Sequence, residues 1–157
     1  MSKNREPLFP VKLEFSRKHW QPFSWLIRWA TWSEWSHVDV IMPDGSYVGA
    51  RGSGGVVRHQ ESQDASVKQV LLVYVTQSVY DRFYSNIESQ IGKPYDWEAI
   101  LGHVFRKKWD DADAWFCSEL VAWAFSEAGM PLIRAAKNKV TPRDLTLSLF
   151  IEECLNG

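Results

Sequence analysis

The segment HVDVIMPDGSYVGA, residues 37–50, contains two β-prone runs separated by Asp44 and Gly45. An Asp-Gly pair between two such runs is the strongest short-range signal for a β-hairpin. The two runs are therefore predicted to form neighbouring antiparallel strands. A glycine-rich turn at residues 52–55 follows, and residues 56–58 after it are expected to form a third strand.

The rest of the chain shows hydrophobic patterns typical of both strands and helices. Alternating or continuous apolar runs predict strands, whereas apolar residues three and four apart, together with capping signals such as Ser78, predict helices. The continuous run 70–75 is typical of a central strand covered on both faces. The expected strands cover residues 11–15, 37–42, 47–50, 56–58 and 70–75, and the expected helices cover residues 22–32, 78–91, 96–105 and 117–128, with a last helix from Thr141. These elements predict an α+β domain in which a mostly antiparallel sheet packs against helices.

Length and composition indicate one domain, residues 1–157, with residues 1–10 as a loose N-terminal arm. A net charge of −1 and a hydrophobic content of 45% argue against nucleic-acid binding and against disorder. No apolar run approaches the roughly 20 residues of a membrane-spanning helix, and no signal-peptide core follows the N-terminus. A cytoplasmic location, with Cys117 and Cys154 reduced, is therefore the default expectation. The oligomeric state stays open.

Cys117 is the first candidate for chemistry, because it opens a predicted helix directly after Trp115 and Phe116. Unpaired backbone N–H groups and the positive end of the helix dipole favour a thiolate at such a position. The same N–H groups can stabilise an oxyanion once the sulfur has attacked a carbonyl. The alternative interpretation is a small buried hydrophobic residue, which is the commoner role of a cysteine beside aromatic residues. Cys154, near the end of the last predicted helix, gains neither effect.

A cysteine nucleophile needs a base, and the chain has four histidines. His37 begins a predicted strand, where its side chain is held rigidly at the end of the sheet. His103 lies off the apolar face of its helix, and His19 and His59 lie in polar segments. His37 is therefore the favoured partner of Cys117, although a strand histidine taken alone is more often structural.

Four motifs now resemble a known family. GKPYDW (92–97) and FCSEL (116–120) are similar to the Gly-x-Pro-Tyr-x-Trp and Asp-Cys-Ser-Gly segments of the NlpC/P60 cysteine peptidases, and HVDVI (37–41) resembles their His-Val hairpin. The hairpin comes first here, as in the circularly permuted branch that includes YiiX-like and lecithin:retinol acyltransferase-like proteins. VTPRDL (140–145) resembles a segment that follows the cysteine helix in YiiX-like proteins. The resemblance spans roughly residues 11–150 and implies a papain-like fold in permuted order.

The resemblance assigns roles to individual residues. It implies that Cys117 is the nucleophile, that His37 is the general base, and that Tyr95 helps to stabilise the oxyanion or to bind substrate. The chain departs from the family at the residue that orients the histidine, because the corresponding window, residues 48–51, contains no acceptor. The substitutes that remain open are Asp39, Gln60, Glu61, a backbone carbonyl or water.

The expected function is a thiol hydrolase acting on amide bonds, with peptidoglycan stem peptides as the substrate class that the resemblance favours. A setting in which phage proteins carry the enzyme to the cell wall is an analogy with signal-less family members. The preferred prediction packs Trp25, Trp29 and Trp32 as one helix face in the core, because a domain of 157 residues with nine tryptophans needs most of them inside. The alternatives to the amide hydrolase are a lipid acyltransferase or acyl hydrolase, in which these tryptophans form a lipid-facing stripe, and a non-catalytic binding or structural module. Zinc-ligand spacing, an EF-hand pattern and a phosphate loop are all missing from the sequence, so no metal or cofactor is expected.

Overall fold

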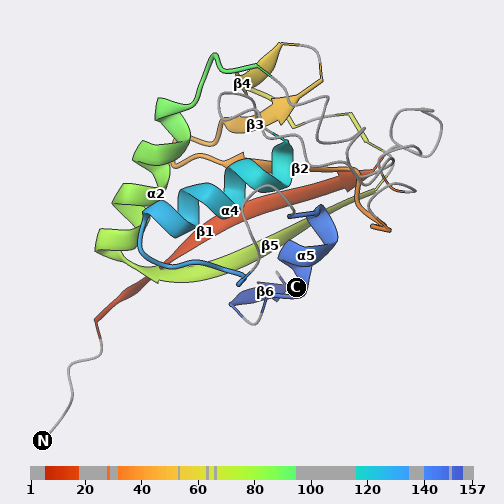
Figure 1. The fold of residues 1–157 in the computed structure, drawn as a ribbon. Helices are drawn as coiled ribbons and strands as arrows, with labels where there is room; N and C mark the ends of the chain where they lie inside the picture. Colours follow the sequence, from red (N-terminus) through yellow and green to blue (C-terminus); the bar gives the residue numbers. More distant parts are fainter. Residues whose placement is uncertain are drawn as a thin grey trace, which may run out of the picture.

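A six-stranded antiparallel sheet forms one layer of the protein (Figure 1). Its strands, in spatial order, are β4 (Gly55–His59), β3 (Tyr47–Arg51), β2 (His37–Ile41), β1 (Leu8–Arg17), β5 (Val67–Thr76) and β6 (Ile151–Glu153). The computed structural model describes residues 6–17, 28, 32–52, 54–62, 64–65, 67–94, 116–134, 140–148 and 150–153. The α+β architecture with a mostly antiparallel sheet is confirmed, and so are the hairpin and the third strand predicted from residues 37–58.

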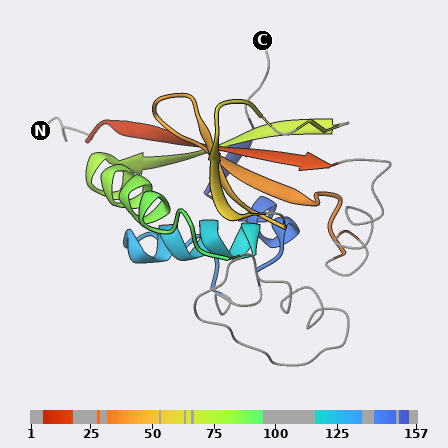
Figure 2. The ribbon, with the colours of Figure 1, turned by 90° about the horizontal axis from the view of Figure 1, so that it is seen from above.

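Three helices of the described residues cover one face of this sheet, as the view in Figure 2 shows. They are α2 (Gln77–Ser89), α4 (Cys117–Glu127) and α5 (Pro142–Thr146). Alternate residues of β1, namely Val11, Leu13 and Phe15, are fully buried. Leu13 and Phe15 lie in register with valines of β2, and Val11 and Leu13 lie in register with apolar residues of β5. The hydrophobic core therefore lies between the sheet and the helices. No helix of the described residues is long and apolar enough to cross a membrane.

The helix α4 is central to this arrangement. It contacts α2, α5, β2 and β3, and all of its residues from Cys117 to Phe125 are buried except Trp123. The ring of Phe125 packs on that of Phe83 from α2, with 4.2 Å between the ring centroids. Gly129, with φ +91°, follows the helix and ends it, as the sequence predicts.

Two predictions about the N-terminal half are wrong in detail. The strand β1 begins at Leu8, so residues 8–10 belong to the sheet and not to a loose arm, because β5 offers ten consecutive pairing partners from Thr76 to Val67. The strand β5 is not covered on both faces, since Tyr74 is 40% exposed while Val73 and Val75 are buried. A continuous apolar run in an antiparallel sheet can thus have one partly exposed face.

The helix boundaries also differ from those predicted. Thr76, and not Ser78, is the N-cap residue of α2, while Ile91 lies beyond its end and is 39% exposed. The last helix ends at Thr146 and β6 follows, so Cys154 comes after a strand and not at a helix end. Cys154 itself lies outside the described residues, and so do the predicted helix 96–105 and all of the predicted helix 22–32 except residues 28 and 32.

Candidate active site

Cys117 is held in place by the way α4 begins. Phe116, in an extended conformation, is the N-cap residue, and the Leu120 N–H donates to its carbonyl. The fully buried Ser118 donates its Oγ hydrogen bond to the carbonyl of Val140 at 2.5 Å. Thr141, the next residue, starts α5 with a capping box. The first turn of α4 is thereby tied to the start of a second helix, which restricts the positions that the Cys117 sulfur can take.

His37 and Asp39 form a hydrogen-bonded pair on one strand. The strand β2 places both side chains on the same face, because residues two apart in a strand point the same way. The Nε2 atom of His37 lies 2.8 Å from Oδ1 of Asp39. Since Asp39 occupies Nε2, the other ring nitrogen, Nδ1, is the one left for a thiol. Asp39 therefore supplies the orienting group that the sequence left undecided.

A third residue, Arg51, holds the other side of the Asp39 carboxylate. Its Nη2 atom donates to Oδ2 of Asp39 at 2.8 Å. The side chain of Asp39 is 1% exposed and that of Arg51 is 15% exposed, so the ion pair is shielded from water. The carboxylate lies over Gly49, where an added Cβ would come within 2.0 Å of Oδ1 of Asp39.

The electrostatics of the site favour a charged imidazole. Burial lowers the pKa of His37, but the charge and hydrogen bond of Asp39 and the hydrogen bond and charge of Cys117 raise it to about 10. Burial likewise raises the pKa of Asp39, but the charges and hydrogen bonds of His37 and Arg51 lower it to about 2. His37 is therefore an imidazolium and Asp39 a carboxylate at neutral pH.

Further ionisable groups surround this pair. Glu14 of β1 is the register partner of Asp39, is buried, and accepts a hydrogen bond from Ser62. Burial, followed by the charges of Glu14 and Asp39, raises the pKa of Tyr47. The pKa of His59 is lowered, first by burial and then by the charge of Arg51. His59 thus lies on β4 within reach of these charges, and not in the irregular polar segment expected for it.

The structure brings together the two main residues predicted from the sequence, because the Cys117 side chain interacts with the His37 imidazole. Both are buried, however, with exposed fractions of 1% for Cys117 and 9% for His37. Gln60 and Glu61 are exposed and are not the partners of His37 in this structure. Tyr95 lies outside the described residues.

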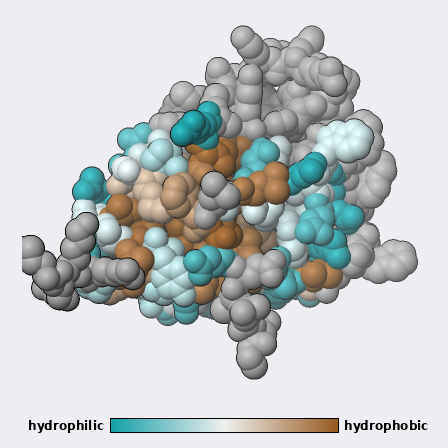
Figure 3. Space-filling model, turned by 90° about the horizontal axis from the view of Figure 1, so that it is seen from below, coloured by the Kyte–Doolittle hydropathy of each residue, from teal (hydrophilic) through white to brown (hydrophobic). Residues whose placement is uncertain are grey.

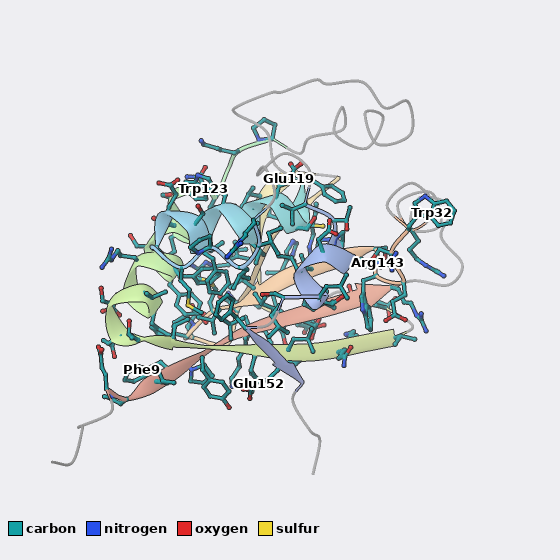
Figure 4. The ribbon with its side chains drawn as sticks, turned by 60° about the horizontal axis from the view of Figure 1, so that its bottom comes forward. Phe9, Trp32, Glu119, Trp123, Arg143 and Glu152 are labelled. Carbon is teal, nitrogen blue, oxygen red and sulfur yellow. The ribbon has the colours of Figure 1, made fainter. Side chains whose placement is uncertain are left out.

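Sequence reasoning missed Arg51 and did not single out Glu119. Arg51 lies within residues 48–51, where an acceptor for the imidazole is expected. Because a cation cannot accept a hydrogen bond from imidazole, the sequence pattern does not predict a role for Arg51. Glu119 is buried in the first turn of α4 (Figure 4), where a negative charge interacts favourably with the helix dipole. Its spacing of two residues from Cys117 was the available signal.

The arrangement has the parts of a thiol nucleophile with an oriented acid–base partner. A sulfur at a helix start, an imidazole beside it and a carboxylate behind the imidazole are groups that thiol-dependent acyl transfer uses. Among the described residues, no group of three or more His, Cys, Asp or Glu side chains could hold a metal ion. In comparisons with known proteins, the chain matches no protein-family model and no curated protein.

Proposed function

We propose that the protein is a cysteine-dependent hydrolase that cleaves amide bonds, with Cys117 as the nucleophile and His37 as the acid–base group. The observation that carries this proposal is the pair of hydrogen bonds that join Arg51 to Asp39 and Asp39 to His37, together with the electrostatic interaction between His37 and Cys117. A purely structural buried cysteine does not need an imidazole oriented by a shielded carboxylate. The resemblance to NlpC/P60 peptidases adds peptidoglycan stem peptides as the substrate class.

The reaction would use Cys117 and His37 together. The Cys117 thiolate attacks the carbonyl carbon, the carbon–sulfur bond forms, and backbone N–H groups of the first turn of α4 stabilise the oxyanion. His37 gives its proton to the amide nitrogen, the carbon–nitrogen bond breaks, and the amine leaves. Water then attacks the thioester while His37 takes a proton from it, which releases the acid and restores the thiolate. Tyr95 would add an oxyanion contact, as the resemblance implies.

The burial of Cys117 sets a condition on this reaction. Because the residue is only 1% exposed, an acyl donor reaches the sulfur only after the atoms that cover it move aside. Such a movement is common in enzymes that exclude water from a reactive intermediate. Acylation of Cys117 by any reagent therefore requires this movement as well as the chemistry of the thiol.

A lipid acyl substrate is the second candidate, and the exposure of Trp32 favours it. Trp32 is 82% exposed and has φ +51°, so it does not belong to a buried helix face, contrary to the preferred prediction. It projects beside Arg143 of α5, whose Nη1 donates to the Trp32 carbonyl (Figure 4). Leu147 and Phe150 are 67% and 50% exposed. Trp25 and Trp29 lie outside the described residues.

The surface in Figure 3 has apolar residues at its centre and hydrophilic residues around them. Among the described residues, the large hydrophobic side chains that are exposed are those of Leu8, Trp32, Tyr74, Ile91, Leu147 and Phe150. Single exposed apolar residues are normal on soluble proteins, and only a contiguous patch indicates a partner. The amide substrate therefore stays the first proposal and the lipid substrate the second.

The test is acylation of Cys117 by p-nitrophenyl acetate, followed by mass spectrometry of the intact protein and its peptides. We expect one acetyl group on the Cys117 peptide of the wild type, none on that peptide of Cys117→Ala, and wild-type behaviour for Cys154→Ser. Purified peptidoglycan and phosphatidylcholine vesicles then compete for the acyl site. New amino groups released from peptidoglycan support the amide substrate, and released fatty acid supports the lipid substrate. Absence of any acetylated Cys117 would refute the hydrolase and leave the binding module.

A further inference from the structure

Both oxygens of the Asp39 carboxylate have a charged partner. Oδ1 faces Nε2 of His37 and Oδ2 faces Nη2 of Arg51, each at 2.8 Å. The three side chains are 11%, 1% and 15% exposed, in the order His37, Asp39, Arg51. A buried carboxylate with a single partner is unfavourable, because the second oxygen is left without hydrogen bonds in a medium of low dielectric constant. Arg51 thus completes the environment that Asp39 needs.

The position of this carboxylate depends on the absence of a side chain at residue 49. Oδ1 of Asp39 lies where the Cβ of residue 49 would be, at 2.0 Å, and the Asp39 Cγ is 3.2 Å from the same point. The φ angle of Gly49 is not in the left-handed region, so its backbone conformation is open to other residues. Glycine is therefore needed at residue 49 because a Cβ there would occupy the space of the Asp39 carboxylate. Residue 49 lies on β3, and the acceptor that faces His37 is Asp39 from β2, the strand of the histidine itself.

We propose that Arg51 is a positioning residue, which holds the Asp39 carboxylate over Gly49 so that Oδ1 faces Nε2 of His37 and Nδ1 stays directed to Cys117. The proposal rests on the proposed function for its kinetic consequence, but its consequence for the His37 imidazole holds without any activity. Arg51 acts through Asp39 and does not touch the reacting atoms. Its role is thus to fix the angle of the ring.

An arginine suits this role for two reasons. Its planar guanidinium meets a carboxylate edge in a defined orientation, which a lysine ammonium does not. The charge of Arg51 also compensates that of Asp39 beside a second acid. Glu14 is the register partner of Asp39 on β1, and like charges directly opposite each other destabilise a strand pair. Glu14 has its own hydrogen bond from Ser62, to which Lys68 donates at 2.7 Å. Hydrogen bonds therefore join Lys68 to Glu14 through the Ser62 hydroxyl, whereas Arg51 contacts Asp39 directly.

The other titratable groups near the pair come from β3, β4 and α4. They are Tyr47, His59 and Cys117, and each has an electrostatic interaction with His37 or Asp39. Burial raises the pKa of Tyr47 and lowers that of His59, so both shifts favour the neutral forms of these two groups at neutral pH. Among these described groups, Arg51 is the cation that contacts the Oδ2 side of Asp39.

The experiment compares Arg51→Met with Arg51→Lys, Gly49→Ala and a matched control, Arg58→Met. Arg58 lies on β4 and pairs with Asp44 and Glu88 at 2.9 and 2.8 Å, so it is an arginine of the same sheet that bonds carboxylates outside the site. The first readout is the Nε2–H resonance of His37 in histidine-selective NMR, which reports its hydrogen bond to Asp39. The second is the rate at which p-nitrophenyl acetate acetylates Cys117.

We expect Arg51→Met to weaken or remove the downfield Nε2–H resonance and to lower the acetylation rate by about 10- to 100-fold, as misplacing a reacting group does. Arg51→Lys should lie between Met and the wild type, and Arg58→Met should match the wild type in both readouts. Gly49→Ala should reproduce the defect of Arg51→Met with the cation still present, which keeps the test informative if Arg51→Met does not fold. An unchanged resonance and rate in folded Arg51→Met, or in Gly49→Ala, would overturn the proposal. A wild type that is never acetylated while the resonance still depends on Arg51 would refute the proposed function alone.

Discussion

The substitution Asp39→Asn removes the charge behind His37 and keeps the shape of the side chain. The two charged groups meet at 2.8 Å between Nε2 and Oδ1, and both are almost fully buried. Two unit charges about 4 Å apart at an effective dielectric constant of about 20 interact by about 4 kcal/mol, which corresponds to about 3 pKa units. We therefore expect Asp39→Asn to lower the pKa of His37 from about 10 to about 7. A titration of the His37 Cε1–H resonance between pH 5 and 11 measures this change directly.

The same shift predicts how stability depends on pH. A histidine whose pKa is raised in the folded state stabilises the fold fully below its unfolded value of about 6.5, and the contribution disappears as the pH rises through the folded pKa of about 10. The free energy of unfolding of the wild type should thus fall between these two pH values, by at most about 5 kcal/mol. Asp39, whose pKa is lowered to about 2, stabilises the fold above its ordinary value of 3.8 and loses this contribution as the pH falls through 2.

Urea denaturation across this pH range, for the wild type, Asp39→Asn and His37→Gln, is the matching assay. The His37→Gln curve contains the titration of every other group, so its difference from the wild type isolates His37. We expect that difference to shrink steadily from pH 6.5 to pH 10 and to be nearly flat in the Asp39→Asn background. A wild-type His37 that titrates near its ordinary pKa, or an Asp39→Asn variant with an unchanged pKa, would show that Asp39 does not govern the imidazole.

Four further substitutions test two turn glycines, the start of α4 and the exposed tryptophan. Gly55→Ala should destabilise the protein by about 2 to 4 kcal/mol, because φ is +72° and the new Cβ would lie 2.0 Å from the Lys93 carbonyl oxygen. Gly45→Ala, where φ is +85° and the new Cβ would meet no atom within 4 Å, should lower the free energy of unfolding by only about 1 to 2 kcal/mol in the same urea experiment. Ser118→Ala leaves a buried carbonyl without its donor and should lower the unfolding free energy by about 1 to 3 kcal/mol together with the acetylation rate of Cys117, and loss of stability with an unchanged rate would separate the start of α4 from the chemistry. Because Trp32 is 82% exposed, Trp32→Phe should reduce the part of the tryptophan fluorescence that iodide quenches. If anionic liposomes do not protect Trp32 of the wild type from iodide, the result would count against the lipid substrate.

Local signals were sufficient for much of the fold. The Asp44-Gly45 turn determines the β2–β3 hairpin within a few residues, since the turn and the alternation of the flanking runs act over short distances. The Thr141-Pro142 start of α5 and the Gly129 end of α4 are likewise decided by neighbouring residues. For the same reason the sequence located Cys117 at the first position of α4.

The tertiary structure decided the rest, because it depends on contacts between distant residues. The central place of β1 follows from its pairing with both β2 and β5, and this extends it to Leu8 beyond the reach of any local pattern. In the sequence, Gly49 is simply a residue without a hydrogen-bond acceptor. The pairing of β2 with β3 places the Asp39 carboxylate in the space that a side chain at residue 49 would occupy. The burial of Cys117 is also a property of the packed chain. Hydrophobic periodicity specifies which face of an element is apolar, whereas the partner of a polar side chain is set by the register and order of the strands.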